Sequence, residues 1–417
     1  MLVRFTVRNY LSFRDEVVFD LFPTGLQTLQ DHIISDNTGK KVQSLPISLI
    51  YGANASGKSN LLEALRFVRE FVRWGTEMNR PICVTPFLLD PTTKDEPSRF
   101  ELVFKTRGVV YTYGFVVSRD AVLEEWLFAY FSKSEERIYE RKLENGKTLF
   151  HFGRRLKKRE FGRADAYVKN NTLFVTFAHE KNEILETVYR WFCDSLFVLP
   201  AGANFDHVAK FLHRNPKVKE FVSDKLKETD IGIESIDIKE IKKEKQDKDR
   251  FLKNVFPPLN LDAIEQITIH PMFVKHRDSV GNVIMMPLQV ESDGTKRMIE
   301  LLPLFDIKDA GEKIVFIDEI DRSLHPLLSR WILENCIAIA KAKKGESCQF
   351  VFTTHDTNLL DRRLLRRDEI WFIEKDTGGC SHLSRLSEFK VNEGLNYENG
   401  YLNGRFGAIP FPVLSEE

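Results

Sequence analysis

Apolar and polar residues alternate over short runs in two parts of the chain, at its start and between residues 81 and 152. Alternation with a period of two is typical of strands with one buried face. Segments 2–10 and 16–21 therefore predict a pair of strands, and the polar, turn-rich residues 22–44 predict a loop. Asn145-Gly146 lies between two further strand-like segments, and this dipeptide predicts a hairpin turn.

Continuous apolar runs predict buried strands elsewhere, at 45–51, 313–317 and 350–353. An amphipathic helix is expected from Asn60 to about Trp74, and helical spacing extends from about 182 to 227. Strands return at 267–270 and 283–286, after which helices and strands alternate to about Leu386.

This order predicts an α/β fold in which one nucleotide-binding domain is interrupted by an antiparallel β lobe and a helical lobe. The expected parts are the N-terminal part of the nucleotide domain at 1–80, the β lobe at 81–152, a helical and charged insertion at 153–260, and the C-terminal part of the nucleotide domain with its tail at 261–417.

The charge balance of the chain bears on nucleic-acid binding. The 61 lysines and arginines balance 61 acidic residues, so a nucleic-acid contact would need a local basic surface. The basic run 154–159 is one candidate, although a solvated loop or a partner surface is the favoured interpretation.

The five scattered cysteines form no Cys-x-x-Cys pair, and no histidine stands at ligand spacing, which favours reduced thiols over disulfides or zinc. With no signal sequence and no apolar span, a cytoplasmic protein without membrane contact is expected.

A phosphate-binding loop is predicted between the strand at 45–51 and the helix after it, because residues 52–59 fit Gly-x4-Gly-Lys-Ser. Its strand–loop–helix setting favours this interpretation over a chance Gly-Lys-Ser turn. Successive backbone N–H groups would form an anion site at the helix N-terminus. Lys58 is expected to reach the β- and γ-phosphates of ATP, and Ser59 to ligate Mg²⁺. The expected nucleotide contacts are Gly52, Asn54, Ala55, Ser56, Gly57, Lys58, Ser59 and Asn60.

Two buried strands end in polar residues that suit catalysis. The strand at 313–317 ends in Asp318 and Glu319, and such adjacent carboxylates at the end of an apolar strand indicate a cation nearby. Asp318 suits the Mg²⁺ shell, and Glu319 suits a general base for the attacking water. The second strand ends at His355, whose neutral ring could bind a γ-phosphate. Glu319, Lys58 and His355 are thus the expected catalytic residues.

A second anion site is expected at Ser292-Asp293-Gly294, because a serine hydroxyl and a glycine backbone stand there at the start of a predicted helix.

The order of these motifs resembles the ATP-binding-cassette ATPases, specifically the soluble SMC/RecF/OLD-like branch. The opening run 5–13 resembles the start of that branch, whose backbone lines the adenine pocket. The resemblance implies that Ser292 and Gly294 form the signature motif, Asp321 belongs to the D-loop, and His355 is the switch histidine. It also implies a head-to-tail dimer or higher homo-oligomer, in which each ATP lies between the phosphate loop of one subunit and the signature serine of the other.

A closer resemblance, carried by Pro86–Asp90, the missing coiled coil and the ending 401–410, is to compact ATPases of bacterial abortive-infection and phage-defence operons. These are the Rlo/AbiLi-like ATPases and the ATPase subunit of the PARIS system. The resemblance implies a sensor or switch that controls a separate effector, such as a Toprim-type nuclease, with DNA or a phage protein as trigger.

The chain departs from the family pattern at two places. No glutamine stands at the Q-loop position, since the next one after Lys58 is Gln246, and the segment around Pro86-Phe87 is the candidate replacement. Only 417 − 355 = 62 residues follow His355, fewer than a Toprim domain needs, so the nuclease is expected in another chain.

Three alternatives remain at this stage. One is a RecF-like or SMC-like clamp that binds DNA in repair, against which the zero net charge counts mildly. A transporter motor is disfavoured because residues 291–295 depart from Leu-Ser-Gly-Gly-Gln. GTP in place of ATP is open, although no Asn-Lys-x-Asp is present to bind guanine.

Overall fold

The chain folds into two units, each described by itself. Unit 1 comprises Met1–Ala201, Ala310–Asp321 and Pro326–Glu417, and unit 2 comprises Gly202–Asp309 and Arg322–His325. The structure, a computed structural model, describes residues 1–36, 41–76, 80–156, 161, 164–202, 205–229, 232–243, 267–306, 311–342, 348–390, 394 and 396–409.

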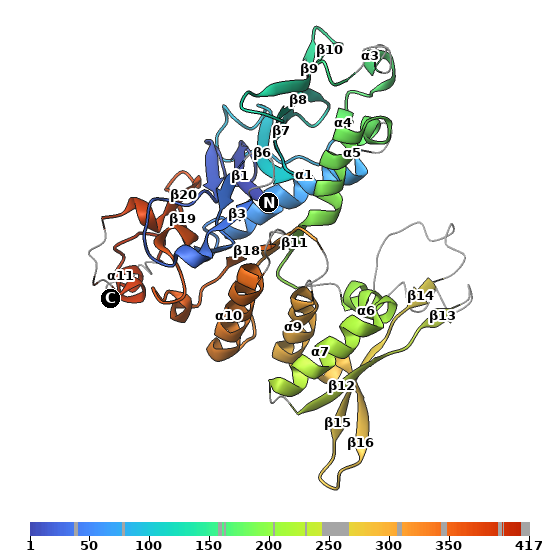
Figure 1. Ribbon diagram of the computed structural model, residues 1–417, viewed down its shortest axis with the longest axis vertical. Helices are drawn as coiled ribbons and strands as arrows, with labels where there is room; N and C mark the ends of the chain where they lie inside the picture. The colour runs from blue at the N-terminus through green and yellow to red at the C-terminus, as the bar shows by residue number, and fades with distance from the viewer. Residues whose placement is uncertain are drawn as a thin grey trace. The chain divides into compact units, whose positions relative to one another are not determined.

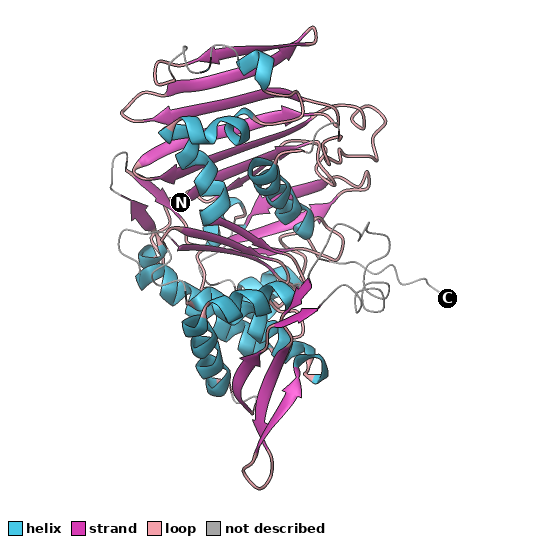
Figure 2. Cartoon of the chain, turned by 90° about the vertical axis from the view of Figure 1, so that its right-hand side faces the viewer, coloured by secondary structure: helices cyan, strands magenta, loops and turns pink. Residues whose placement is uncertain are grey.

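Unit 1 contains an antiparallel sheet of seven strands, which run side by side in Figure 2. Its order is β10 (Lys147–Phe152), β9 (Glu136–Glu144), β8 (Val122–Tyr130), β7 (Val109–Val117), β6 (Ser98–Thr106), β1 (Leu2–Arg8) and β2 (Val17–Asp20). The predicted pairing of segments 2–10 and 16–21 is confirmed by β1 and β2. The predicted hairpin is confirmed too, since Asn145 and Gly146 have φ values of 50° and 74° between β9 and β10, as a tight primed turn requires.

A second sheet of unit 1 is parallel except at one edge. Its order is β11 (Leu196–Leu199), β17 (Lys313–Ile317), β18 (Cys348–Thr353), β5 (Ile47–Tyr51), β19 (Ile370–Lys375) and β20 (Ser381–Arg385), with only β20 antiparallel to its neighbour. The strand β5 is buried throughout, as its unbroken apolar sequence predicts. The α/β fold class is therefore confirmed.

The helix α1 (Lys58–Trp74) shares one hydrophobic core with both sheets of unit 1 (Figure 1). Its Phe67 packs against Phe100 of β6 at 5.1 Å between ring centroids. The strand β2 reaches the parallel sheet directly, where Phe19 contacts Trp371 of β19 at 5.1 Å. This shared core holds α1, and the loop before it, against both sheets.

A buried glutamine joins the two sheets by hydrogen bonds. Gln349 of β18 accepts the backbone N–H of Leu2 at 2.7 Å and donates to the Leu2 carbonyl at 2.9 Å. Its amide also donates to Ser44 Oγ and to the Leu45 carbonyl, so each side-chain group has a partner. The start of the chain is thereby fixed to the strand that precedes His355.

The remaining elements of unit 1 lie between or after the strands of the two sheets. They are η1 (Gln30–His32), the hairpin of β3 (Ile34–Asp36) and β4 (Val42–Ser44), α3 (Ala164–Tyr167), α4 (Phe174–Ala178), η2 (His179–Lys181), α5 (Glu183–Arg190), the π-helical turn η3 (Trp191–Ser195), α10 (Pro326–Ala342), η8 (Thr357–Leu359), η9 (Arg367–Glu369), η10 (Leu386–Glu388) and α11 (Tyr397–Leu402).

Several sequence expectations differ from these elements. Residues 22–44 are not a simple loop, because η1, β3 and β4 form there. The helical prediction for 182–227 is wrong at β11, a four-residue strand at the edge of the parallel sheet. The β lobe expected at 81–152 continues the sheet of β1 and β2. Of residues 239–260, at the end of the expected helical and charged insertion, only 239–243 lie among those described, and they include β13 (Ile241–Lys243).

Unit 2 combines helices with antiparallel strands. One sheet contains β12 (Ile233–Ile238), β15 (Met272–Arg277) and β16 (Val283–Pro287). A separate two-stranded ribbon pairs β13 with β14 (Ile267–Ile269). Its helical segments are α6 (Phe205–Arg214), α7 (Pro216–Glu228), η6 (Leu288–Val290), α9 (Asp293–Leu301) and η7 (Leu302–Phe305). In the described part of the chain, no helix is both long and apolar enough to cross a membrane.

A buried carboxylate organises one end of the antiparallel sheet. Glu125 of β8, which is fully buried, accepts hydrogen bonds from the Tyr139 hydroxyl at 2.7 Å and from the backbone N–H groups of Phe174 and Val175 at 2.6 and 3.1 Å. Arg141, also fully buried, lies 3.5 Å from the same carboxylate. The carboxylate thus holds the first residues of α4 against the sheet.

We expect Glu125→Ala to lower the free energy of unfolding of unit 1 by about 3–5 kcal/mol, because it leaves the buried Arg141 without its counter-charge. Urea unfolding followed by circular dichroism would measure the change. Glu124→Ala is the matched control: the neighbouring Glu124 pairs with Lys142 at the surface, and we expect its loss to cost at most about 1 kcal/mol. Equal effects of the two substitutions would contradict this account.

Candidate functional site

The predicted phosphate loop lies between β5 and α1, where glycine is required twice. Gly57 caps α1 with a φ of 113°, and a Cβ there would clash with the Ser381 hydroxyl. A Cβ at Gly52 would clash with the Ile373 carbonyl of β19. Ala55 also takes a left-handed conformation, with a φ of 61°. The loop is thus curled tightly at the N-terminus of a 17-residue helix, which is the geometry that presents backbone N–H groups to an anion.

Two serines outside the predicted motif hold this loop from the side. The Ser381 hydroxyl donates to the Ser56 carbonyl at 2.5 Å and lies 2.8 Å from Ser12 Oγ. Asn60 of α1 donates to the same Ser12 Oγ at 2.8 Å. Ser12 belongs to the run 5–13, which was expected to line the adenine pocket because of its family resemblance. Nothing in the sequence indicated a role for Ser381.

Lys58 points back into its own loop. Its ammonium donates to the carbonyl oxygens of Gly52 at 2.8 Å and Ala53 at 3.0 Å, and the residue is only 6 % exposed. Desolvation lowers the pKa of Lys58 to about 8, although Asp318 and Glu319 oppose this shift. A bound phosphate would supply the negative charge that the loop carbonyls only partly replace.

The strand order brings the predicted catalytic residues to the same edge as this loop. The strand β18 lies between β5 and β17 and runs parallel to both. Asp318 and Glu319 follow β17, and His355 comes two residues after β18. Because carboxyl ends of parallel strands meet at one edge, these residues gather around the phosphate loop.

Thr353, the last residue of β18, connects both acids. Its hydroxyl donates to Asp318 Oδ1 at 2.5 Å and accepts the backbone N–H of Glu319 at 2.7 Å. Glu319 has a φ of 49°, a conformation that non-glycine residues rarely adopt. Asp318 is almost fully buried, and its N–H donates to the Leu199 carbonyl of β11 at 2.9 Å. The turn after β17 is therefore fixed by hydrogen bonds from both neighbouring strands.

Asp321 fixes the segment that carries His355. Its carboxylate accepts the Thr354 hydroxyl at 2.7 Å and the His355 backbone N–H at 3.3 Å. Partial desolvation and the nearby Lys58 charge lower the pKa of His355, so its ring stays neutral at neutral pH. Thr353 and Thr354 were missed as functional residues in the sequence, although two polar residues at the end of an apolar strand are a usable signal.

Ser292 and Gly294 belong to unit 2 and stand at the start of α9. Ser292 caps the helix, since its hydroxyl accepts the Thr295 N–H at 3.1 Å. A Cβ at Gly294 would lie 2.7 Å from the Ser323 carbonyl, so glycine allows α9 to approach the segment after Asp321. Ser292 is exposed at the helix N-terminus, as an anion site requires.

The segment around Pro86-Phe87 packs against the N-terminal turn. The Phe87 N–H donates to Asn9 Oδ1 at 3.0 Å, and the Leu11 N–H donates to the Thr85 carbonyl at 2.9 Å. Its role in place of a Q-loop stays a prediction.

The residues of unit 1 fit a nucleotide phosphate with a divalent metal ion. Ser56 Oγ is buried and has no hydrogen-bond partner among the described residues, which leaves a donor in the loop. Ser59 is exposed at the first turn of α1, and the buried Asp318 supplies a carboxylate directly after β17. Hydroxyl and carboxylate oxygens are ligands that Mg²⁺ accepts in such sites.

Comparison with known proteins finds a family model and a relative that are similar to this chain in sequence. A family model described as "AAA domain, putative AbiEii toxin, Type IV TA system" matches residues 47–361, which include the phosphate loop, Asp318-Glu319 and His355. An ATP/GTP phosphatase of Helicobacter pylori is 29% identical over 102 residues, which are 24% of this chain and 26% of that protein. The chain thus matches about a quarter of that relative's length.

A solved structure, the SMC head domain from Thermotoga maritima, is similar over 94% of this chain and 99% of that chain, with 12% sequence identity and a TM-score of 0.38.

We expect triphosphate affinity to fall as the pH rises through about 8, because the free Lys58 then loses its proton. Below that pH the ammonium is already charged, so binding should take up no proton at Lys58. Calorimetry in buffers of different ionisation enthalpy would measure the proton uptake, which should appear only at alkaline pH. In Lys58→Arg the charge persists, so this pH dependence should disappear. An unchanged pH profile in Lys58→Arg would contradict the assignment.

Proposed function

The chain belongs to this AbiEii-type AAA-domain family, and on that premise we propose that it binds ATP with Mg²⁺ and hydrolyses the γ-phosphate. The observation that carries the proposal is the hydrogen-bonded link through Thr353. It joins the Asp318 carboxylate and the Glu319 backbone, which follow β17, to the strand that lies beside the phosphate-loop strand. A cation, two acids and a neutral histidine from three adjacent parallel strands are the parts that phosphoryl transfer to water requires.

Each residue has a distinct role in this proposal. The Lys58 ammonium gives up its hydrogen bonds to the carbonyls of Gly52 and Ala53 and donates instead to β- and γ-phosphate oxygens. Glu319, held by the Thr353 hydroxyl, polarises the attacking water as a general base. The neutral His355 donates a hydrogen bond to the γ-phosphate.

Ser59 and Asp318 would hold Mg²⁺, which supplies positive charge to the β- and γ-phosphate oxygens. Asp318 is suited to this role because the Thr353 hydroxyl fixes its carboxylate, and its burial strengthens electrostatic interactions there. The Thr353 hydroxyl therefore serves the metal-binding carboxylate and the general base together.

We further propose that two copies pair head to tail, so that α9 of one copy faces the ATP of the other. The exposed Ser292 cap and the N-terminus of α9 provide N–H and O–H donors for a γ-phosphate. Close packing of Gly294 on Ser323 joins this donor group to the segment that follows Asp321. Since Asp321 also binds the backbone of His355, closure of a dimer would act on both parts of the site.

The biological role that we propose is a switch in bacterial antiphage defence. ATP would hold the dimer closed, and hydrolysis or a phage trigger would reopen it and change its contact with a separate effector, for which we propose a Toprim-type nuclease. The family description, which names a toxin of a toxin–antitoxin system, supports this setting.

We expect Glu319→Gln to reduce kcat for ATP hydrolysis by about 10²–10⁴-fold, since glutamine cannot accept the proton of the attacking water. The ATP dissociation constant should stay within about threefold, because glutamine keeps the size and shape of the Glu319 side chain and the change acts on the chemical step. Steady-state phosphate release and equilibrium nucleotide binding measure the two effects. Glu334→Gln, on the exposed face of α10, is the matched control and should leave kcat unchanged. Hydrolysis at the wild-type rate in Glu319→Gln would contradict the proposal.

The switch role is tested by trapping the closed state in the native host. Tagged Glu319→Gln, which keeps ATP bound, should retain a partner with ATP-dependent association, and Lys58→Ala should lose it. The retained fraction should carry nuclease activity on DNA that the ATPase alone lacks. If the two variants retain the same proteins, or if no nuclease activity accompanies the trapped form, the effector part of the proposal is wrong.

A further inference from the structure

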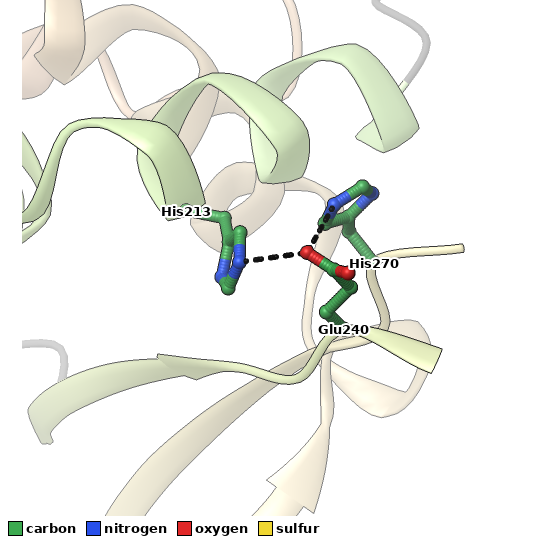
Figure 3. A group of neighbouring side chains, drawn as sticks. All are labelled: His213, Glu240 and His270. Carbon is green, nitrogen blue, oxygen red and sulfur yellow. Dashed lines mark ion pairs between the residues drawn. The ribbon is translucent and has the colours of Figure 1, made fainter. Parts of the chain in front are cut away.

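Three potential metal ligands converge in unit 2 from separate elements (Figure 3). His213 stands in the last turn of α6, Glu240 lies between β12 and β13, and His270 follows β14. Their ligand atoms all lie within 4.8 Å of one another. The group belongs to unit 2 alone, so it is separate from the phosphate loop of unit 1.

Strand register explains why Glu240 and His270 meet. Ile238 pairs with Met272, and Ile241 pairs with Ile269, so the two residue numbers add up to 510 in both pairs. Glu240 and His270 have the same sum and therefore stand opposite each other between the two paired segments. A backbone hydrogen bond from Lys239 N to the Pro271 carbonyl, at 3.1 Å, fixes this position. Side chains directly opposite in such a pair are natural neighbours.

The distances approach those of a zinc site. His213 Nε2 lies 3.2 Å from Glu240 Oε2, and His270 Nε2 lies 4.0 Å from the same oxygen. Tetrahedral zinc with bonds of about 2.0–2.1 Å places neighbouring ligand atoms about 3.3 Å apart. The first pair already has this spacing, and a small rotation of the His270 or Glu240 side chain would bring the second pair to it.

The surroundings leave room for an ion. The three side chains line a cavity of about 380 Å³ together with Lys210, Arg214 and Thr268. Lys210 and Arg214 are exposed, so solvent screens their charges from the cavity. His270 is 7 % exposed, which shields one ligand from water. An arrangement of two imidazoles, one carboxylate and open space matches zinc sites that keep one position for water.

We propose that His213, Glu240 and His270 bind one Zn²⁺ through two imidazole nitrogens and one carboxylate oxygen, with the fourth position open to water. The ion replaces the direct pairing of Glu240 with the two histidines. It fastens the end of α6 to the strands of unit 2, independently of nucleotide binding. Two neutral imidazoles and a carboxylate prefer zinc over Mg²⁺, which favours oxygen ligands only.

A second group, Asp376, Cys380 and His382 of unit 1, carries no such proposal. Asp376 and Cys380 lie in the turn between β19 and β20, and His382 lies at the start of β20. The Asp376 carboxylate already forms hydrogen bonds within this turn. It accepts the Cys380 N–H at 2.9 Å and pairs with His382 at 2.9 Å. Local turn bonding accounts for this arrangement.

Zinc titration of the chelator-treated full chain tests the proposal, with a chromophoric competitor reporting free Zn²⁺ and elemental analysis giving the bound amount. We expect one tightly bound equivalent per chain. His213→Ala, His270→Ala and the shape-preserving Glu240→Gln should each weaken binding by at least about tenfold. Co²⁺ in place of Zn²⁺ should show the visible absorption of a four-coordinate site, which the same variants lose.

Three controls separate this site from others. His207→Ala removes an exposed histidine of the same helix α6 and should leave zinc affinity unchanged. Asp318→Asn should also keep the zinc, so that the outcome is independent of the ATPase proposal. His382→Ala accounts for any zinc at the β19–β20 turn. Circular dichroism confirms that each variant folds.

Four results would overturn the proposal. They are the absence of a tightly bound equivalent, wild-type affinity in Glu240→Gln, zinc binding that only His382→Ala removes, and binding of inorganic phosphate at this cavity without zinc.

Discussion

The hydroxyl of Thr353 is the contact on which the arrangement of the site depends. It donates to one carboxylate and accepts the backbone N–H of the next residue, so a single side chain sets both Asp318 and Glu319. The strand that carries Thr353 lies between the acidic strand and the phosphate-loop strand. Any shift of β18 would therefore move the acids and His355 together, so the proposed metal ligand, general base and phosphate sensor depend on one strand.

Hydrogen bonds from distant segments also hold the phosphate loop. Ser381 of β20 and Ser12 of the N-terminal turn contact the loop and the first turn of α1, and two glycines remove the side chains that would block this approach. Gln349 fixes the N-terminal strand to β18. The loop is consequently supported by segments more than 300 residues apart in the sequence, and its geometry depends on the fold of the whole of unit 1.

The fold class and the phosphate loop were predictable because their signals are local. Each of these signals, whether a continuous apolar strand, a glycine-rich loop or a pair of adjacent carboxylates, consists of residues that are contiguous in the sequence. Ser381 could not be found this way, because its role arises from pairing between distant strands. The polar end of an apolar strand marks Thr353 as a candidate, but it does not show which residues Thr353 contacts. The strand β11 was missed because four residues are too few to show a period after a long helical pattern. The cysteine and histidine spacing argued against zinc, yet Glu240 and His270, 30 residues apart, lie opposite each other through strand register. His213, on the helix α6, lies close to both of them.

The central claim is that each ATP site needs residues of two subunits, and mixing two inactive variants tests it most directly. Lys58→Ala removes the phosphate-loop cation, and Ser292→Arg blocks the helix end that would face the partner's nucleotide. Each variant alone should be inactive. In a 1:1 mixture, half of the dimers carry one intact site, so about a quarter of the wild-type ATPase rate should return. Full activity of Ser292→Arg alone, or no recovery in a mixture that forms mixed dimers, would contradict the account.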